Sequence, residues 1–404
     1  MRLLLSAYAC EPNKGSEPSV GWNWMKALVL QGHEVVLITR SNNAPSVQAA
    51  IVAQELSVGS TYYELPAWCL RWKRWRGGTY FYYLLWQYGA YRHARRLHRA
   101  RPFDLVHHIT FASFRQPSFM GALGIPFIFG PVGGGETMPR QLRRGLSWSG
   151  RFREILRDTA NALVGYDPLM HFTFSKASLI ACTTAETKER IPAPYRRKCV
   201  VLPTIGIDPR DFETAPIIKN NQISFLYVGR LLYWKGLHLV LRAFPAVRRH
   251  LPEVRLKVVG EGSDLPWLKR IADECGVANC VEWLPWMPHK DIASEYRNNV
   301  AFVFPSLHDS GGLVVLEALT AGLPVICLNL GGPGAIVNSS CGVVIDATDT
   351  EEDTVLKLLA EAMVTLAQKP HIRETLAANS LSRALSFTWE RAAERLYSST
   401  SLKF

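Results

Sequence analysis

The sequence predicts an α/β protein with two Rossmann-like, doubly wound domains that face a cleft. Its 404 residues are too many for one ordinary domain. Strand and helix patterns alternate in both halves of the chain, which is typical of parallel sheets covered by helices. A polar, Pro-bearing stretch at residues 206–221 lies between the halves and has the composition of a linker. We therefore expect two domains joined near this stretch.

The first half opens with the apolar run "RLLLSAY", which predicts a buried strand followed by a Gly-containing loop. The pattern of "VGWNWMKALVLQG" predicts an amphipathic helix that ends at Gly32, and "HEVVLITR" predicts the next strand. Later strands are indicated by "FDLVHHITF" and "FIFGPVGGGE". Residues 1–205 are expected to form the first domain.

The second half repeats this order from "ISFLYVGR" onward. Strands are predicted at "VRLKVVGEG", "VEWLPW", "VAFVFPS" and "PVICLNL", and the segments between them have helical periodicity. Residues 206–385 are expected to form the second domain. The acid-rich "DTEED" around Asp349 is interpreted as the solvated start of a helix.

The positive charge is confined to the first half. Of the net +12, residues 1–205 carry 26 Lys and Arg against 12 Asp and Glu, which is +14, and the remainder carries −2. Residues 68–101 and 140–157 are rich in Arg, and the first of these segments also interleaves aromatic residues. Such segments favour an anionic membrane surface, or a groove for an anionic, lipid-linked acceptor. The alternative is a solvated basic helix with a few packed aromatics; nucleic acid is not expected, because no reader motif accompanies the charge.

The composition argues against several other classes of protein. The longest apolar runs fall far short of the roughly 20 residues of a membrane-spanning helix. The eight cysteines are scattered without CxxC spacing, so neither a structural zinc nor a disulfide framework is expected. We expect a cytoplasmic protein, associated with the cytoplasmic face of a membrane.

Two cations follow a predicted strand in "YVGRLLYWKG". Arg230 leaves the strand end at Gly229, and Lys235 precedes the next helix. Cations in such a loop suit a diphosphate whose negative charge builds up as it departs. Two surface cations at an exposed loop are the alternative.

The segment "HDSGGLVVLEALTAGLPV" combines features that a core strand would not contain. Asp309 precedes a predicted helix, and Gly311 and Gly312 allow backbone amides near the helix start to approach an anionic or hydroxyl-rich ligand. Glu317 lies within an otherwise apolar helix, where a carboxylate needs polar partners. Ribose or sugar hydroxyls would supply them, and a hydrogen bond to a neighbouring loop is the other possibility.

These motifs, with "VVGEG" and "FTWERAAERLY", resemble glycosyltransferase family 4, the large group of retaining enzymes with the GT-B fold. The resemblance implies that Arg230 and Lys235 hold the donor diphosphate, that Asp309 begins the family's acid-seven-residues-Glu motif, and that Glu317 binds the donor ribose. It also implies that the final helix, at about residues 386–404, packs back on the first domain.

The resemblance implies further contacts. His107 or His108 would contact the donor sugar near the reacting centre, although the family commonly has His-x-His here. Acceptor contacts are expected from Glu17, Gly134 and Glu136. Further donor contacts are expected from Gly15, Ser16, Gly229, Gly260, Gly262, Trp286, Met287, Gly311, Gly312 and Leu313.

The implied activity is transfer of a hexose, with retention, from a nucleoside diphosphate sugar to a glycan or lipid-linked acceptor in surface polysaccharide biosynthesis. UDP-sugar is favoured and GDP-sugar stays open. No metal or other cofactor is expected, because the chain has no DxD motif. Asp309 stands where the family usually has Glu, and Gly311 where an aromatic residue is usual, so the identity of the sugar stays open. The alternatives are a small soluble aglycone as acceptor, a nucleotide-sugar epimerase or phosphorylase on the same fold, and a non-catalytic nucleotide-sugar-binding protein.

Overall fold

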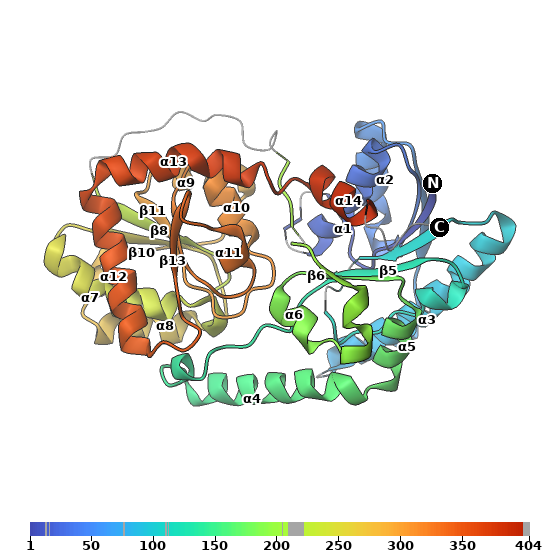
Figure 1. The fold of residues 1–404 in the computed structure, drawn as a ribbon, viewed down its shortest axis with the longest axis horizontal. Coiled ribbons are helices and arrows are strands. Elements are labelled where there is room, and N and C mark those ends of the chain that lie inside the picture. Colours follow the sequence, from blue (N-terminus) through green and yellow to red (C-terminus); the bar gives the residue numbers. More distant parts are fainter. Residues whose placement is uncertain are drawn as a thin grey trace. The chain divides into compact units, whose positions relative to one another are not determined.

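The chain divides into two compact units, each built on one parallel sheet (Figure 1). Unit 1 comprises Met1–Gly135, Thr159–Thr204 and the chain from Trp389 on, and unit 2 comprises Glu136–Asp158 and Ile205–Thr388. The predicted α/β class with two Rossmann-like sheets is confirmed. This computed structural model describes residues 1–12, 14–15, 17–75, 77–109, 111, 113–203, 205–208 and 222–398.

The sheet of unit 1 has the strand order β3-β2-β1-β4-β5-β6-β7, and every pair is parallel. Its strands are β1 (Arg2–Ser6), β2 (Glu34–Arg40), β3 (Val58–Tyr63), β4 (Leu105–His108), β5 (Phe127–Val132), β6 (Leu179–Cys182) and β7 (Cys199–Val201). Its helices are α1 (Glu17–Leu30), α2 (Ala44–Ala53), α3 (Gly78–Ala100), α5 (Pro168–Lys176), α6 (Ala185–Arg190) and α14 (Trp389–Tyr397). The predicted first strand, helix and second strand are therefore confirmed, with the helix starting earlier than Val20.

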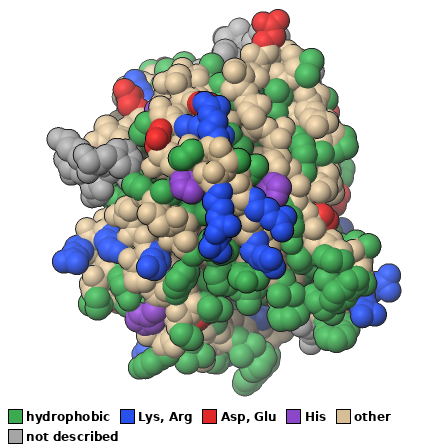
Figure 2. Space-filling model, turned by 90° about the vertical axis from the view of Figure 1, so that its right-hand side faces the viewer, with side chains coloured by type: hydrophobic (Ala, Val, Ile, Leu, Met, Phe, Trp, Pro, Cys, Tyr) green, Lys and Arg blue, Asp and Glu red, His purple; other side chains and the backbone are tan. Residues whose placement is uncertain are grey.

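The basic-aromatic segment of unit 1 is only partly a surface. Tyr82, Tyr83 and Trp86 of α3 are fully buried in the core, where they pack with Phe127 and Phe129 of β5. Five other aromatic side chains of the segment are half or more exposed: Trp68, Trp75, Tyr80, Phe81 and Tyr88. Figure 2 shows hydrophobic side chains gathered on one face of the molecule, with Lys and Arg side chains beside them.

The sheet of unit 2 has the order β10-β9-β8-β11-β12-β13, again with parallel pairs only. Its strands are β8 (Ser224–Val228), β9 (Arg255–Val259), β10 (Val281–Leu284), β11 (Ala301–Phe304), β12 (Val325–Leu328) and β13 (Gly342–Ile345). Its helices are α7 (Leu237–His250), α8 (Leu265–Glu274), α9 (His289–Arg297), α10 (Leu313–Thr320), α11 (Gly331–Ile336), α12 (Glu352–Gln368) and α13 (Pro370–Ala384). The strand order reverses between β8 and β11, and ligands of doubly wound sheets bind beyond the carboxyl ends of the strands at this point.

Residues 136–158 belong to unit 2, although we expected residues 1–205 to form one domain. Long-range polar contacts hold this segment. The Arg242 guanidinium pairs with Oε1 of Glu352 at 2.6 Å, and the backbone amide of Gly145 donates to Oε2 of Glu352 at 3.1 Å. The "DTEED" segment does begin a helix, but one of its acids is not simply solvated, because Glu352 fastens residues 136–158 to unit 2.

Helix α4 (Trp148–Leu163) begins in unit 2 and ends in unit 1. It carries exposed apolar side chains at Trp148, Phe152, Ile155 and Leu156, whereas Glu154 is fully buried. Among the described residues, none of the helices has both the length and the apolar content to cross a bilayer.

Candidate functional site

The loops that follow β8 and β11 lie side by side, because these strands are paired in the sheet. The first loop contains Arg230 and a short 3₁₀ turn at Tyr233–Lys235, and the second contains His308 and Asp309. The backbone amide of Leu307 donates to the carbonyl of Trp234 at 2.8 Å, which joins the two loops. The predicted site residues of this region are thus assembled within unit 2.

Lys235 and Asp309 form a close ion pair. The Nζ atom of Lys235 lies 2.5 Å from Oδ2 of Asp309, and both side chains are less than one fifth exposed. The amide of Gly311 also donates to Oδ1 of Asp309, at 3.2 Å. Burial alone would raise the pKa of Asp309, but the Lys235 ammonium and the Gly311 amide outweigh it and hold this pKa below its ordinary value. Asp309 is therefore a carboxylate at neutral pH.

We expect this ion pair to give unit 2 a pH-dependent stability. The folded pKa of Asp309 is depressed, so the stabilisation is present above the unfolded pKa of about 3.9 and is lost as pH falls through the folded value. Lys235→Gln should therefore destabilise the protein most at neutral pH, and its deficit should shrink as pH falls below about 4. Denaturant unfolding of both proteins at several pH values measures this; a deficit that does not change with pH would contradict it.

Arg230 is exposed at the end of β8, and its side chain makes no hydrogen bond or ion pair with other residues that the structure describes. It is available to a ligand beyond the carboxyl end of the sheet. Gly229, just before it, has φ +158°, close to ordinary extended backbone.

Backbone packing requires glycine at positions 260 and 262, which the sequence interpretation missed. A Cβ on Gly260 would lie 2.0 Å from the carbonyl oxygen of Gly229, and one on Gly262 would lie 2.2 Å from that of Leu231. The loops after β8 and β9 therefore approach so closely that only glycine fits. Donor contact at these two positions stays a prediction.

The start of α10 depends on two glycine pairs. Gly312 caps the helix with φ +80°, and Leu313 is its first residue. A Cβ on Gly332 would lie 2.4 Å from the carbonyl oxygen of Gly311, and the amide of Gly332 donates to the carbonyl of Asp309 at 2.7 Å. The Gly331-Gly332 pair, which follows β12, thus shapes the Asp309 loop. The sequence marks this role by a pair of adjacent glycines after a predicted strand, the second such pair after Gly311-Gly312.

Glu317 is buried on α10 and has a partner in the protein. The hydroxyl of Tyr296 donates to its Oε2 atom at 2.9 Å, and Tyr296 is itself fully buried. Burial first, and then the neighbouring Glu317 carboxylate, raise the pKa of Tyr296, which keeps this hydroxyl a donor. We considered a hydrogen bond from a neighbouring loop to Glu317, and the structure supplies a comparable one from Tyr296 on α9. Ribose binding by Glu317 stays a prediction.

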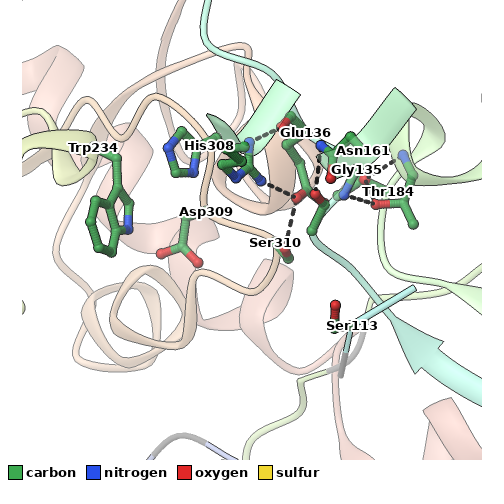
Figure 3. Close-up of polar contacts among 12 residues, drawn as sticks. Ser113, Gly135, Glu136, Asn161, Thr184, Trp234, His308, Asp309 and Ser310 are labelled. Atoms are coloured by element: carbon green, nitrogen blue, oxygen red, sulfur yellow. Dashed lines mark hydrogen bonds and ion pairs between the residues drawn. The ribbon is translucent and has the colours of Figure 1, made fainter. Parts of the chain in front are cut away.

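Glu136 lies in unit 2 and is buried. Its Oε2 atom accepts a hydrogen bond from the Ser310 hydroxyl at 2.8 Å and lies 3.7 Å from the Arg157 guanidinium. Figure 3 shows Ser310 pointing at the Glu136 carboxylate, with Asp309, His308 and Trp234 to the left of this contact. We expected Glu136 in a flexible loop as an acceptor contact. It supports the loop that carries Asp309, and its contact with an acceptor stays a prediction.

Glu154 is a member of the site that sequence reasoning missed. Its Oε1 atom accepts hydrogen bonds from the Tyr233 hydroxyl at 2.8 Å and from Nε2 of His308 at 2.9 Å. The His308 ring stacks on Trp234, with ring centroids 5.7 Å apart. The only hint in the sequence was a single acid inside the basic run of residues 140–157.

His107 and His108 lie at the end of β4 in unit 1, and both are buried. Nε2 of His107 lies 2.7 Å from the Gly130 carbonyl, and its Nδ1 lies 2.9 Å from the Tyr397 hydroxyl. Since a carbonyl only accepts, Nε2 carries the proton and Nδ1 accepts from Tyr397. Burial lowers the pKa of His107 to about 3, so this ring is neutral. These contacts favour a structural role for His107.

The Nε2 atom of His108 lies 3.1 Å from the Tyr83 hydroxyl. Contact between His108 and a donor sugar stays a prediction.

The remaining predicted residues are less informative. Gly15 is exposed, Glu17 begins α1 in a half-buried position, and Ser16 lies outside the described residues. Gly134 has φ +95°, and its carbonyl accepts from the Asn161 amide at 3.1 Å. Trp286 is 69% exposed and Met287 is half-buried, after β10. Among the described residues, His, Cys, Asp and Glu form no cluster that could hold a metal ion.

Comparison with known proteins finds a family match that lies within unit 2. Residues 210–373 match the family model for glycosyl transferases group 1. The glycogen synthase of Mycobacterium tuberculosis is 33% identical over 221 residues, which are 54% of this chain and 52% of that protein. The D-inositol 3-phosphate glycosyltransferase of Corynebacterium jeikeium is 31% identical over 179 residues, 42% of this chain and 41% of that protein. The chain thus spans about half the length of the curated relatives that it matches.

Solved structures agree over nearly the whole chain. The lipopolysaccharide outer core galactosyltransferase WaaB superposes with a TM-score of 0.62 at 13% identity, covering 98% of both chains. Anabaena HepE in complex with UDP and glucose superposes with a TM-score of 0.61 at 15% identity, also covering 98% of both. At these identities the likeness establishes the fold. Residues 210–373 thus resemble a glycosyl transferases group 1 domain, and the chain has a fold of the GT-B glycosyltransferase type.

Proposed function

We propose that this chain is a retaining glycosyltransferase that transfers a hexose from a nucleoside diphosphate sugar, with UDP-sugar favoured, to a glycan or lipid-linked acceptor. The observation that carries the proposal is the pair of loops after β8 and β11. They bring Lys235 and Asp309 together at the strand-order reversal of unit 2, which the family match covers. A relative named as a glycosyltransferase and a structural neighbour bound to UDP and glucose support the donor class.

In the proposed reaction, Arg230 and Lys235 stabilise the departing diphosphate, because fixed cations neutralise charge as it develops. Lys235 would exchange part of its contact with Asp309 for a phosphate oxygen when the donor binds. Asp309 would then contact the sugar, and Glu317 the ribose. No metal ion or other cofactor is assigned a role in this reaction.

The most direct test needs no acceptor. Calorimetry with UDP and GDP measures which nucleoside diphosphate binds, and slow release of nucleotide from a panel of UDP-sugars and GDP-sugars identifies the donor. Binding with turnover supports the enzyme, whereas binding without turnover would favour a nucleotide-sugar-binding protein. Absence of both would end the proposal.

We also propose that the acceptor is lipid-linked and that the protein contacts an anionic membrane at the cytoplasmic face, as part of surface polysaccharide biosynthesis. Exposed aromatic side chains beside Arg residues on η2 (Ala67–Arg74) and α3 support this, since such surfaces favour the membrane boundary. The exposed apolar side chains of α4 support it independently.

Arg95, Arg96 and Arg99 on α3 are exposed, and changing all three to Glu should weaken binding to anionic vesicles at least tenfold, because each cation near anionic headgroups contributes roughly 1 kcal/mol. Flotation with vesicles containing phosphatidylglycerol measures the bound fraction. The matched control changes Arg249, Lys269 and Arg270 to Glu, which removes the same charge from exposed positions of unit 2. Equal flotation of wild type with neutral and anionic vesicles, or equal loss in the control, would contradict the proposal.

A small phosphorylated acceptor is the second candidate, because several relatives are named D-inositol 3-phosphate glycosyltransferases. Competition between inositol phosphate and a lipid-linked acceptor, once the donor is known, distinguishes the two.

A further inference from the structure

Glu154 is an ionised carboxylate in the interior of unit 2. Its side chain has no exposed surface. Burial would raise the pKa of Glu154, but the hydrogen bonds from His308 and Tyr233 more than offset this, so the pKa is lowered. A buried charge is costly unless several groups bind it, and an apolar residue at this position would avoid that cost. The carboxylate therefore calls for an explanation beyond packing.

The partners of Glu154 lie one or two residues before the site residues in the chain. Tyr233 lies two residues before Lys235, and His308 lies directly before Asp309. One oxygen atom, Oε1, accepts from both partners, at 2.8 and 2.9 Å. The stacking of His308 on Trp234 adds a second side-chain link between the same loops. The two loops are thus joined by a side-chain bridge through Glu154 in addition to the backbone hydrogen bond between Leu307 and Trp234.

We propose that Glu154 is a positioning residue, whose Oε1 atom holds the Tyr233 and His308 side chains together and thereby fixes the spacing of Lys235 and Asp309. It touches neither substrate nor reacting atoms. This inference rests on the proposed function, in which Lys235 binds the diphosphate and Asp309 the sugar. Small displacements of reacting groups lower rates strongly, on the order of 10²-fold for about 1 Å. The backbone link between Leu307 and Trp234 remains without Glu154, so the loss should be smaller than this.

The main test is Glu154→Ala, measured by donor turnover without acceptor. We expect kcat to fall about tenfold while the Kd for UDP changes less than about threefold, since Arg230 and Glu317 keep their positions. Glu154→Gln keeps an acceptor oxygen where Oε1 lies and should recover kcat to within about threefold of wild type. A Glu154→Ala enzyme with kcat within threefold of wild type would overturn the inference, and so would a Gln variant no better than Ala.

The matched control is Glu352→Gln. Glu352 also fastens residues 136–158 to unit 2, through Gly145 and Arg242, but it touches neither the Tyr233 loop nor the His308 loop. We expect its kcat to stay near that of wild type. An equal loss in both variants would mean that Glu154 only anchors the segment, and the positioning role would be wrong.

Tyr233→Phe covers the case in which Glu154→Ala fails to fold. It removes only the hydroxyl that donates to Glu154, and we expect kcat to fall about threefold. Combined with Glu154→Ala it should cause no further loss, because both changes break the same hydrogen bond. Unchanged kcat in Tyr233→Phe, or additive losses, would overturn the inference.

The outcomes also separate this inference from the proposed function. A wild type that neither binds UDP nor releases nucleotide from a donor defeats both. A wild type that turns over donor and loses activity on Lys235→Ala, but keeps it on Glu154→Ala, defeats only the positioning role.

Discussion

Replacing Lys235 with alanine is expected to lower donor turnover by about 10²–10³-fold, the range seen when one stabilising group for developing charge is removed. The variant loses the cation proposed to stabilise the leaving diphosphate, and it leaves the Asp309 carboxylate without its ion-pair partner. Arg230→Ala should have an effect of the same order. The rate of nucleotide release from the preferred donor measures both.

The structure offers a matched control for this substitution. Lys257 pairs with Glu295 at 2.8 Å, with side-chain exposures of 18% and 19%, close to the 18% and 16% of Lys235 and Asp309. Lys257→Ala removes an equally buried cation from the same unit but not from the β8 and β11 loops, so turnover should hardly change. Losses under threefold for both Lys235→Ala and Arg230→Ala would remove the electrostatic mechanism.

Ending the chain before Trp389 is expected to prevent stable folding of unit 1. The deletion removes α14, which packs on α1 and buries Trp389, Ala393 and Leu396. It also removes the Tyr397 hydroxyl from the fully buried His107 ring. Thermal unfolding and soluble yield measure the effect; a shortened protein that melts within a few degrees of the full chain would contradict it.

A single substitution separates the hydrogen bond from the packing of α14. Tyr397→Phe keeps the ring and leaves Nδ1 of His107 buried without a donor, which should cost about 1–3 kcal/mol of unfolding free energy. Tyr62→Phe is the control, because the Tyr62 hydroxyl lies 3.1 Å from the Ser60 hydroxyl in a half-buried place where water can replace it. Equal losses in the two variants would contradict the role of the His107 contact.

The fold was predictable because its evidence is local. Apolar strands of four to seven residues, such as Glu34–Arg40 and Val325–Leu328, alternate with amphipathic helices, and this order alone indicates parallel sheets. The membership of residues 136–158 in unit 2 was not predictable. It depends on contacts between residues far apart in the chain, such as Arg242 with Gly145, and no local pattern marks them.

The site was predictable where chemistry and chain position coincide. Lys235 and Asp309 stand in loops directly after strands, and paired strands bring such loops together. Glu154 and Glu136 reach the same loops from residues 136–158, so nothing in their own surroundings in the sequence reveals their role. Gly260 and Gly262 illustrate the opposite case: their sequence suggested ligand contact, while the structure supplies a reason in backbone packing.

The pairing of His107 with Tyr397 has a consequence for how the protein is made on the ribosome. These residues are 290 positions apart, so at about 5–20 residues per second the nascent chain waits roughly 15–60 s between them. Throughout that time the apolar side of α1 lacks its final cover, and for the second half of it every strand of the sheet, the last of which ends at Val201, has already been translated. The first unit to be translated is therefore among the last structures to be finished, and premature termination near the end of the message should yield a chain prone to aggregation rather than a working fragment.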